Sequence, residues 1–191
     1  MARFKSESRR NAILDAATEV IAEKGLGAPT SLIAEKAGVA DGSLYTYFKS
    51  KDELLHVLYR ELKNEMADAV MSGFPRREGV QVRLKYIWVN LVNWGAKHPV
   101  RRKVLTLINT WPGLDEESRK AGMAPFLEVH TMMNDAIAQS IFNPLKPDFF
   151  VAVVQSLSEM TINFMRQHPG EADEYRELGF ETLWSAVAKK R

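Results

Sequence analysis

The chain has 191 residues, of which 46% are apolar and 26% charged, and it carries a formal net charge of +2 and no cysteine. The missing cysteines exclude disulfides, thiolate metal sites and a cysteine nucleophile. No window approaches the roughly 18–20 consecutive apolar residues of a membrane span, and the basic N-terminus precedes an amphipathic helix rather than a signal core, so we expect a cytoplasmic protein without membrane contact.

The surplus of positive charge lies at the start of the chain. Residues 1–51 contain eight Lys or Arg and six Asp or Glu, whereas residues 52–191 contain eighteen of each. The surplus is concentrated in Arg3, Lys5, Arg9 and Arg10. Such an arm is typical of DNA phosphate contact and equally of a solvated terminus. Phosphate contact is favoured more for Arg9 and Arg10 than for Arg3.

Apolar residues at helical spacing predict a first helix that begins at Ser6 or Ser8 and ends at Gly25. Two short helices around a glycine follow. Thr30 or Ser31 is suited to begin the first of them, and Gly38 to end it in the left-handed conformation that glycine adopts cheaply. The second is expected at about residues 41–48. The apolar residues expected to face the interior of this pair are Leu32, Ile33, Ala37, Leu44 and Phe48.

Two short helices joined by such a turn form a helix-turn-helix, whose second helix can enter the major groove of DNA. The rest of the chain also predicts helices. The expected segments are a helix from the capping box of Ser50 and Glu53 to about Gly73, a long helix ending at Lys97, residues 100–110, a helical turn from Asp115 through Arg119, residues 126–141, residues 147–168 with Pro147 in the first position, and residues 171–189. About nine helices and no strand signal predict an all-α fold.

The helix-turn-helix region resembles the DNA-binding signature of TetR-type transcriptional repressors. The residues that carry the resemblance are Thr30, Ile33-Ala34, Ala37-Gly38-Val39, Gly42-Ser43-Leu44-Tyr45, Tyr47-Phe48 and Lys51. The resemblance implies a DNA-binding domain at residues 6–66, with the helix-turn-helix at about 29–48. It also implies an effector-binding and dimerisation domain at residues 67–191, and a homodimer that binds a double-stranded operator with an inverted repeat.

The same resemblance, together with side-chain chemistry, suggests the DNA contacts. Gly42 allows a close backbone approach, and the hydroxyls of Ser43 and Thr46 can contact base edges. The residues expected to flank the recognition helix or contact phosphates are Thr30, Ser31, Tyr45, Tyr47 and Lys51. Two alternatives are that Tyr45 packs inside and that Asp41 caps the recognition helix. Because a carboxylate near DNA repels phosphate unless it accepts a cytosine amino group, capping is favoured for Asp41.

The C-terminal region is rich in aromatic and methionine side chains, which can fill a core or line an adaptable cavity. The candidate effector contacts are Trp88, Asn109, Trp111, Phe126, His130, Met133 and Phe164, and the effector is expected to be a small apolar or aromatic molecule. The resemblance implies dimerisation through the last two long helices, with Val153, Leu157, Met160, Leu183 and Trp184 as candidate interface residues.

Other functional classes remain to be weighed. The four histidines are scattered without metal-ligand spacing, and no phosphate loop or nucleophile elbow is present, so we expect no enzyme, no metal and no cofactor. An effector-independent DNA-binding protein and an activator are the alternatives to a repressor. The basic run from Arg101 to Lys103 either pairs with acidic residues of the first helix, among them Asp15, or forms a solvated face.

Overall fold

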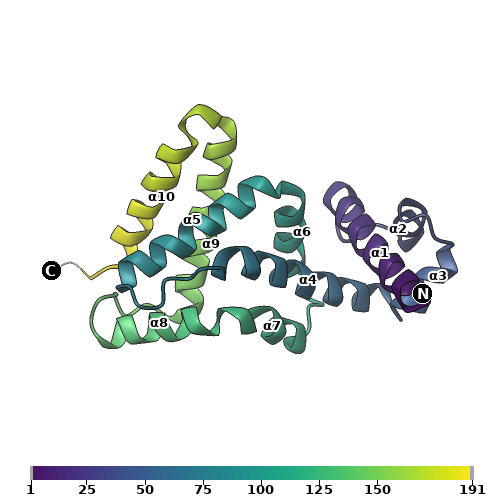
Figure 1. The fold of residues 1–191 in the computed structure, drawn as a ribbon, viewed down its shortest axis with the longest axis horizontal. Helices are drawn as coiled ribbons and strands as arrows, with labels where there is room; N and C mark the ends of the chain where they lie inside the picture. The colour runs from purple at the N-terminus through teal and green to yellow at the C-terminus, as the bar shows by residue number, and fades with distance from the viewer. Residues whose placement is uncertain (1, 190–191) are drawn as a thin grey trace. The chain divides into compact units, whose positions relative to one another are not determined.

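A computed structural model describes the backbone of residues 2–189 and the side chains of residues 6–189, so the side chains of Arg3 and Lys5 lie outside the described residues. The α-helices, shown in Figure 1, are α1 (Ala2–Lys24), α2 (Thr30–Lys36), α3 (Asp41–Tyr47), α4 (Lys51–Met71), α5 (Val80–Lys97), α6 (Pro99–Asn109), α7 (Glu116–Met123), α8 (Leu127–Ala138), α9 (Pro147–Gln167) and α10 (Ala172–Val187). Two 3₁₀ turns, Ala124–Phe126 and Pro169–Glu171, complete the elements.

The expected all-α fold is confirmed over the described residues, which contain one helix more than the nine anticipated. The additional helix is α7, where the sequence predicted only a turn. Asp115 caps it as expected, because its Oδ1 accepts the backbone N–H of Ser118 at 2.7 Å. That bond is also the main reason why the pKa of Asp115 lies below its usual value. The first helix begins earlier than predicted, at Ala2.

The chain divides into two compact units. The first comprises the residues up to Asn64 together with Pro99–Met123, and the second comprises Glu65–His98 and the residues from Ala124 onward. The sequence assigned all residues after 66 to one C-terminal domain, whereas α6 and α7 group here with the N-terminal helices. The division along α4 lies between Asn64 and Glu65.

The first unit is built around helices α1, α2, α3 and α6. Its core includes side chains with no exposed surface, namely Ile13 and Ile21 of α1, Ile33 of α2, Leu44 of α3 and Ile108 of α6. Helix α6 packs against α1, and Arg101 Nη2 lies 3.8 Å from Asp15 Oδ1. Of the two alternatives for the basic run, the ion pair with α1 is therefore present at Arg101. Leu32, expected to be buried, is 37% exposed because it lies on the outer side of α2.

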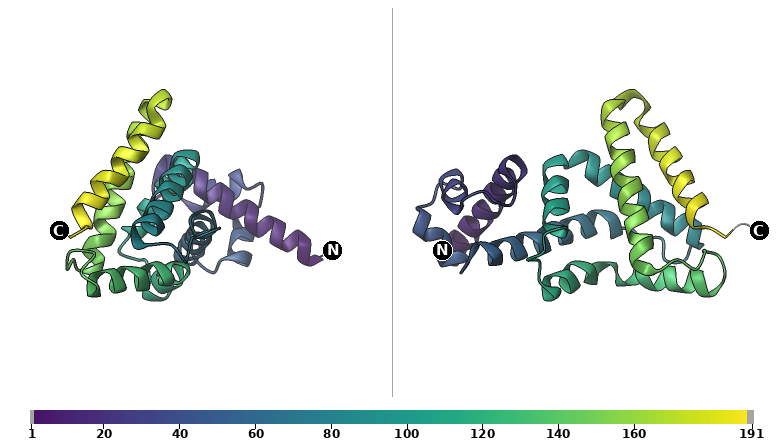
Figure 2. Two further views of the ribbon diagram at one scale, coloured as in Figure 1. Left: turned by 60° about the vertical axis from the view of Figure 1, so that its left-hand side comes forward. Right: turned by 180° about the vertical axis from the view of Figure 1, so that it is seen from behind.

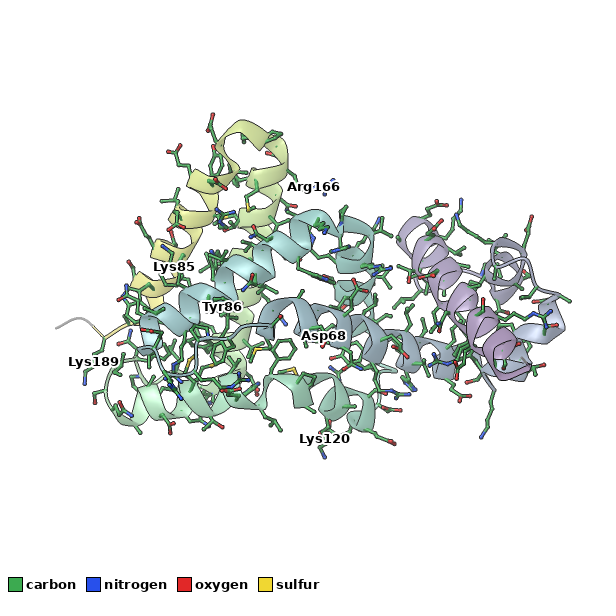
Figure 3. All side chains as sticks on the ribbon, in the orientation of Figure 1. Asp68, Lys85, Tyr86, Lys120, Arg166 and Lys189 are labelled. Carbon is green, nitrogen blue, oxygen red and sulfur yellow. The ribbon has the colours of Figure 1, made fainter. Side chains whose placement is uncertain are left out.

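The second unit is organised around α9 and α10, which lie side by side as consecutive helices joined by the turn at Pro169–Glu171 (Figure 2). Helix α5 packs against both of them. Lys85 of α5, labelled in Figure 3, forms a salt bridge of 2.5 Å with Glu177 of α10. Gly179 allows α10 to approach α5, because a Cβ there would lie 2.6 Å from a ring atom of Trp88. Among the described residues, no helix is both long and apolar enough to cross a membrane.

Candidate nucleic-acid interface

Helices α2 and α3 are joined by a tight turn centred on Gly38, whose φ of +67° lies in the left-handed region. The turn closes with two backbone bonds, from Gly38 N–H to Glu35 O at 3.1 Å and from Val39 N–H to Ala34 O at 3.0 Å. A residue with a Cβ adopts this conformation only with strain, so the glycine is required here. The predicted helix-turn-helix is therefore present, although α2 begins after Pro29 and no side chain caps it.

The rotation of α3 is set by Leu44, which is completely buried. Gly42, Tyr45 and Thr46 are consequently exposed, while Ser43 and Tyr47 are half-buried. The alternative that Tyr45 packs inside is wrong, since 49% of this residue is exposed. Helix α3 thus presents one glycine and several hydroxyl groups to the outside.

Gly42 lies within α3, where the packing of the protein does not require a glycine. A Cβ built there would meet no atom within 4 Å outside the backbone of its own helix. Glycine inside a helix is less favourable than alanine by about 0.5–1 kcal/mol. The open space above Gly42 is therefore suited to the close approach of another molecule.

Asp41 does not cap α3, which corrects the expectation from the sequence. The N-cap position is Ala40, no side chain caps the helix, and Asp41 is the first helical residue. An N-cap side chain must lie one residue before the helix to reach the N–H groups of the first turn. Within the described part of the chain, the carboxylate of Asp41 forms no hydrogen bond or ion pair, and the residue is exposed.

Thr30 and Ser31 lie in the first turn of α2, beside the exposed face of α3. The Thr30 hydroxyl and the Tyr45 hydroxyl are 3.1 Å apart, so the two helices are connected by a hydrogen bond. Ser31 is exposed. The structure therefore brings four predicted contact residues together, since Thr46 lies one position beyond Tyr45 on the outside of α3.

Lys51 combines a structural contact with partial exposure. Its Nζ donates to the carbonyl of Ala28 at 2.6 Å and thereby holds the loop between α1 and α2 against the start of α4. The start of α4 is capped as predicted, because Glu53 N–H donates to Ser50 Oγ at 3.1 Å. The Glu53 carboxylate accepts the N–H of Lys49 at 2.5 Å, one residue earlier than a standard capping box requires.

Arg10, a predicted phosphate contact, is engaged within the protein. Its Nη2 lies 3.1 Å from Glu61 Oε1, and its guanidinium lies 5.9 Å from the ring centroid of Phe48. These contacts connect α1 to α4 and to the end of α3. Arg9 is exposed.

The residues predicted to contact an effector fall into both units. Asn109 and Trp111 belong to the first, where the Trp111 ring lies 5.4 Å from that of His56. The others, in the second unit, are Trp88, Phe126, His130, Met133 and Phe164. Their assignment stays a prediction.

Within the second unit these five residues differ in environment. Trp88 and Met133 are buried in the core, and Trp88 Nε1 donates to the carbonyl of Arg176 at 2.9 Å. Phe126 and His130 are half-buried, whereas Phe164 is 42% exposed and stacks on His168.

The predicted dimer residues also divide by exposure. Val153 and Leu157 are half-buried and Met160 is 46% exposed, so α9 offers apolar surface to a partner. Leu183 has no exposed surface because it packs in the core of its own unit, and this corrects its placement at an interface. Trp184 is half-buried, with its ring 5.8 Å from that of Phe142.

Two buried titratable residues of α4, Tyr59 and Lys63, were not singled out from the sequence. Burial lowers the pKa of Lys63 to about 8 and raises the pKa of Tyr59. Lys63 Nζ lies 5.8 Å from the Tyr59 ring centroid and 4.0 Å from Met123 Sδ. The signal that could have indicated a buried lysine is helical spacing. Lys63 lies four residues after Tyr59 and four before Ala67, and all three are buried.

Comparison with known proteins places this geometry in a family. Residues 13–58 match the family described as bacterial regulatory proteins, tetR family. The fatty acid metabolism regulator protein of Bacillus subtilis (strain 168) is 37% identical over 76 residues, so the alignment spans 39% of this chain and only 39% of that protein.

Two solved structures share the fold over nearly the whole chain. A TetR family transcription regulator from Marinobacter aquaeolei VT8 has a TM-score of 0.88 at 21% identity and covers 98% of this chain and 100% of that one. The transcriptional regulator FadR from Bacillus subtilis, solved in complex with stearoyl-CoA, has a TM-score of 0.69 at 23% identity and covers 92% and 98%. Residues 13–58 therefore carry the DNA-binding region of the tetR family of bacterial regulatory proteins, and the chain as a whole has the fold of solved TetR-type regulators.

Proposed function

We propose that the protein is a repressor that binds an inverted-repeat operator as a homodimer and is released from it by a small, largely apolar or aromatic effector. The observation that carries the proposal is the outer face of α3. Gly42, Tyr45 and Thr46 are exposed there, and Leu44 on the opposite side of the helix is completely buried. A recognition helix needs this combination of a buried inner side and a polar outer side to lie in a major groove.

The proposed contacts follow from the position and chemistry of each side chain. Ser43 and Thr46 contact base edges, because a hydroxyl can donate or accept and the threonine methyl can pack on a thymine methyl. Phosphate contacts fix the orientation of the protein on the duplex. They are assigned to Thr30, Ser31, Tyr45, Tyr47 and Lys51, and Lys51 retains donors for a phosphate because an ammonium has three and only one is used on Ala28.

A stripe of exposed and half-buried apolar residues on α9 supports the homodimer. Residues at spacings of four, four, three and four fall on one side of a helix, and the stripe consists of Phe149, Val153, Leu157, Met160 and Phe164. Phe149 is 59% exposed, and Leu178 on the neighbouring α10 is 55% exposed. Such a surface is unfavourable in water, and a two-fold axis would cover it with the same stripe of a second copy.

The effector class is supported by the apolar character of the second unit and by one relative. FadR of Bacillus subtilis was solved with stearoyl-CoA, a molecule with a long apolar chain. We extend that class to the present chain, with Phe126 and His130 as the half-buried candidates among the predicted contacts. An effector that binds more tightly to the conformation unable to bind DNA would release the operator by this difference in affinity alone.

Selection of binding sites from randomised duplexes tests the DNA-binding part. The expected product is an inverted repeat whose half-site centres are about 34–36 Å apart, one turn of the duplex. Equal affinity for the selected and for unrelated duplexes at moderate salt would contradict the proposal. A promoter carrying the selected site should be transcribed less in the presence of the protein, and increased transcription would indicate an activator.

Titration of the protein–operator complex with stearoyl-CoA tests the effector part. The proposal predicts release of DNA, with coenzyme A as the control that lacks the apolar chain. The same titration with a panel of acyl chains and flat aromatic molecules, matched to one another in charge, then defines the effector class. If none of these apolar molecules binds the protein, the effector-independent alternative is favoured.

A further inference from the structure

Asp41 is the side chain of the DNA-binding face that the proposed contacts do not yet use. It is the single charged residue of α3, whose sequence is Asp-Gly-Ser-Leu-Tyr-Thr-Tyr. It is exposed, it does not cap the helix, and its carboxylate forms no hydrogen bond or ion pair within the described residues. Tyr45 follows it by four positions and so lies beside it on the same side of the helix.

A carboxylate at this position has an electrostatic cost when DNA binds. The phosphates repel it, and in the major groove guanine and thymine present acceptor oxygens to it. The amino group of cytosine offers the compensating partner, because it is a donor without an acceptor beside it on the same base edge. Adenine has an amino donor next to the N7 acceptor and therefore suits an amide, which both donates and accepts.

The composition of α3 makes this contact important for specificity. The side chains with strong preferences for single bases are Arg, Lys, Asn, Gln, Asp and Glu, and Asp41 is the one member of that group in α3. The remaining polar groups of the helix are hydroxyls, which can contact any base edge and therefore discriminate less between bases. Residues at the start of a recognition helix are those that contact base edges.

We propose that Asp41 determines the sequence specificity of the protein by accepting a hydrogen bond from the N4 amino group of one cytosine in each half-site, an inference that rests on the proposed function. The carboxylate selects cytosine by attraction and rejects guanine and thymine by repulsion, so it lowers the affinity for unrelated DNA while it raises discrimination.

Binding-site selection with three full-length proteins tests the inference. The wild type should select a half-site with one fixed cytosine, Asp41→Asn should replace that cytosine by adenine, and Asp41→Ala should accept any base there. Both variants should bind unrelated duplexes more tightly than the wild type does, because a repulsive charge has been removed. Asp41 is exposed and does not cap α3, so these substitutions leave the fold intact, which circular dichroism can verify.

A modified operator isolates the amino group itself. Pyrimidin-2-one in place of the selected cytosine removes only N4, and it should weaken wild-type binding by about 10-fold. The same change should leave the affinity of Asp41→Ala unaltered. Thr46→Ala serves as the control, since its affinity should still fall when N4 is removed.

The outcomes separate the inference from the proposed function. If the wild type selects an operator but Asp41→Asn selects the same bases at every position, the inference is overturned and the proposed function stands. If pyrimidin-2-one weakens the wild type and Asp41→Ala equally, the inference is likewise overturned. A wild-type protein that selects no sequence at all overturns both.

Discussion

The hydroxyl oxygens of Thr30 and Tyr45 lie 3.1 Å apart, so a hydrogen bond joins the first residue of α2 to the exposed side of α3. One O–H is used within the pair, and the other remains able to donate to a phosphate oxygen. The pair thus fixes the position of the hydroxyls as well as the contact between the two helices.

If the two hydroxyls act as a unit, the effects of Thr30→Val and Tyr45→Phe on stability and on DNA binding should not be additive. Each is expected to lower the free energy of unfolding by about 0.5–1 kcal/mol and to weaken DNA binding, with little further loss in the double variant. Urea unfolding and operator titration of all four proteins give the coupling energy. Additive losses would mean that the hydroxyls act independently.

Replacement of Lys51 by methionine should weaken binding to every duplex. The loop between α1 and α2 loses the donor to Ala28 O, and the DNA loses one phosphate contact. The slope of log affinity against log salt should therefore fall by about one. Lys120→Met is the control, because this lysine of α7 is exposed and lies outside the proposed interface. An unchanged slope of log affinity against log salt would mean that Lys51 makes no phosphate contact and has a structural role alone.

Met160→Glu should convert the homodimer to a monomer and lower operator affinity by at least 100-fold, because a two-fold interface receives the introduced charge twice. The fold should survive, since Met160 is 46% exposed in the protomer. Val82→Glu is a matched control on α5, where an apolar residue is 50% exposed. Light scattering after size exclusion gives the mass, and a dimeric Met160→Glu protein would rule out the α9 stripe.

The buried ammonium of Lys63 predicts an unusual pH dependence. Its pKa falls from 10.5 to about 8 on folding, so between those values the unfolded state binds more protons and stability rises with pH. Lys63→Met should remove roughly 1–2 kcal/mol of the increase in unfolding free energy between pH 7.5 and 9.5. Urea unfolding across this range provides the measurement, and identical slopes for both proteins would count against a buried charge.

The fold was largely predictable because its boundaries depend on local chemistry. Gly38, with its positive φ, and Pro147, in the first turn of α9, lie where the sequence placed them. The misjudged positions depend on tertiary contacts. Leu32 is 37% exposed although the sequence placed it inside, and Leu183 is fully buried in its own unit although it was expected at the dimer interface.

The candidate site shows the same division between local and tertiary information. The exposure of Gly42 and Thr46 follows from the helical spacing relative to the buried Leu44. The role of Asp41 depended on the position where α3 begins, and a shift of one residue turns a cap into an exposed first-turn carboxylate. The grouping of α6 with α1 depends on packing between segments far apart in sequence, which periodicity alone does not contain.

The effect of Gly42→Ala on operator affinity tests the central claim, that the outer face of α3 contacts DNA. A Cβ at this position meets no atom within 4 Å, so the variant should be as stable as the wild type or more stable by about 0.5–1 kcal/mol. The account predicts that this equally stable protein binds the selected operator at least about 10-fold more weakly, because the methyl group occupies the space of the duplex. Unchanged affinity in the stabilised variant would contradict the account.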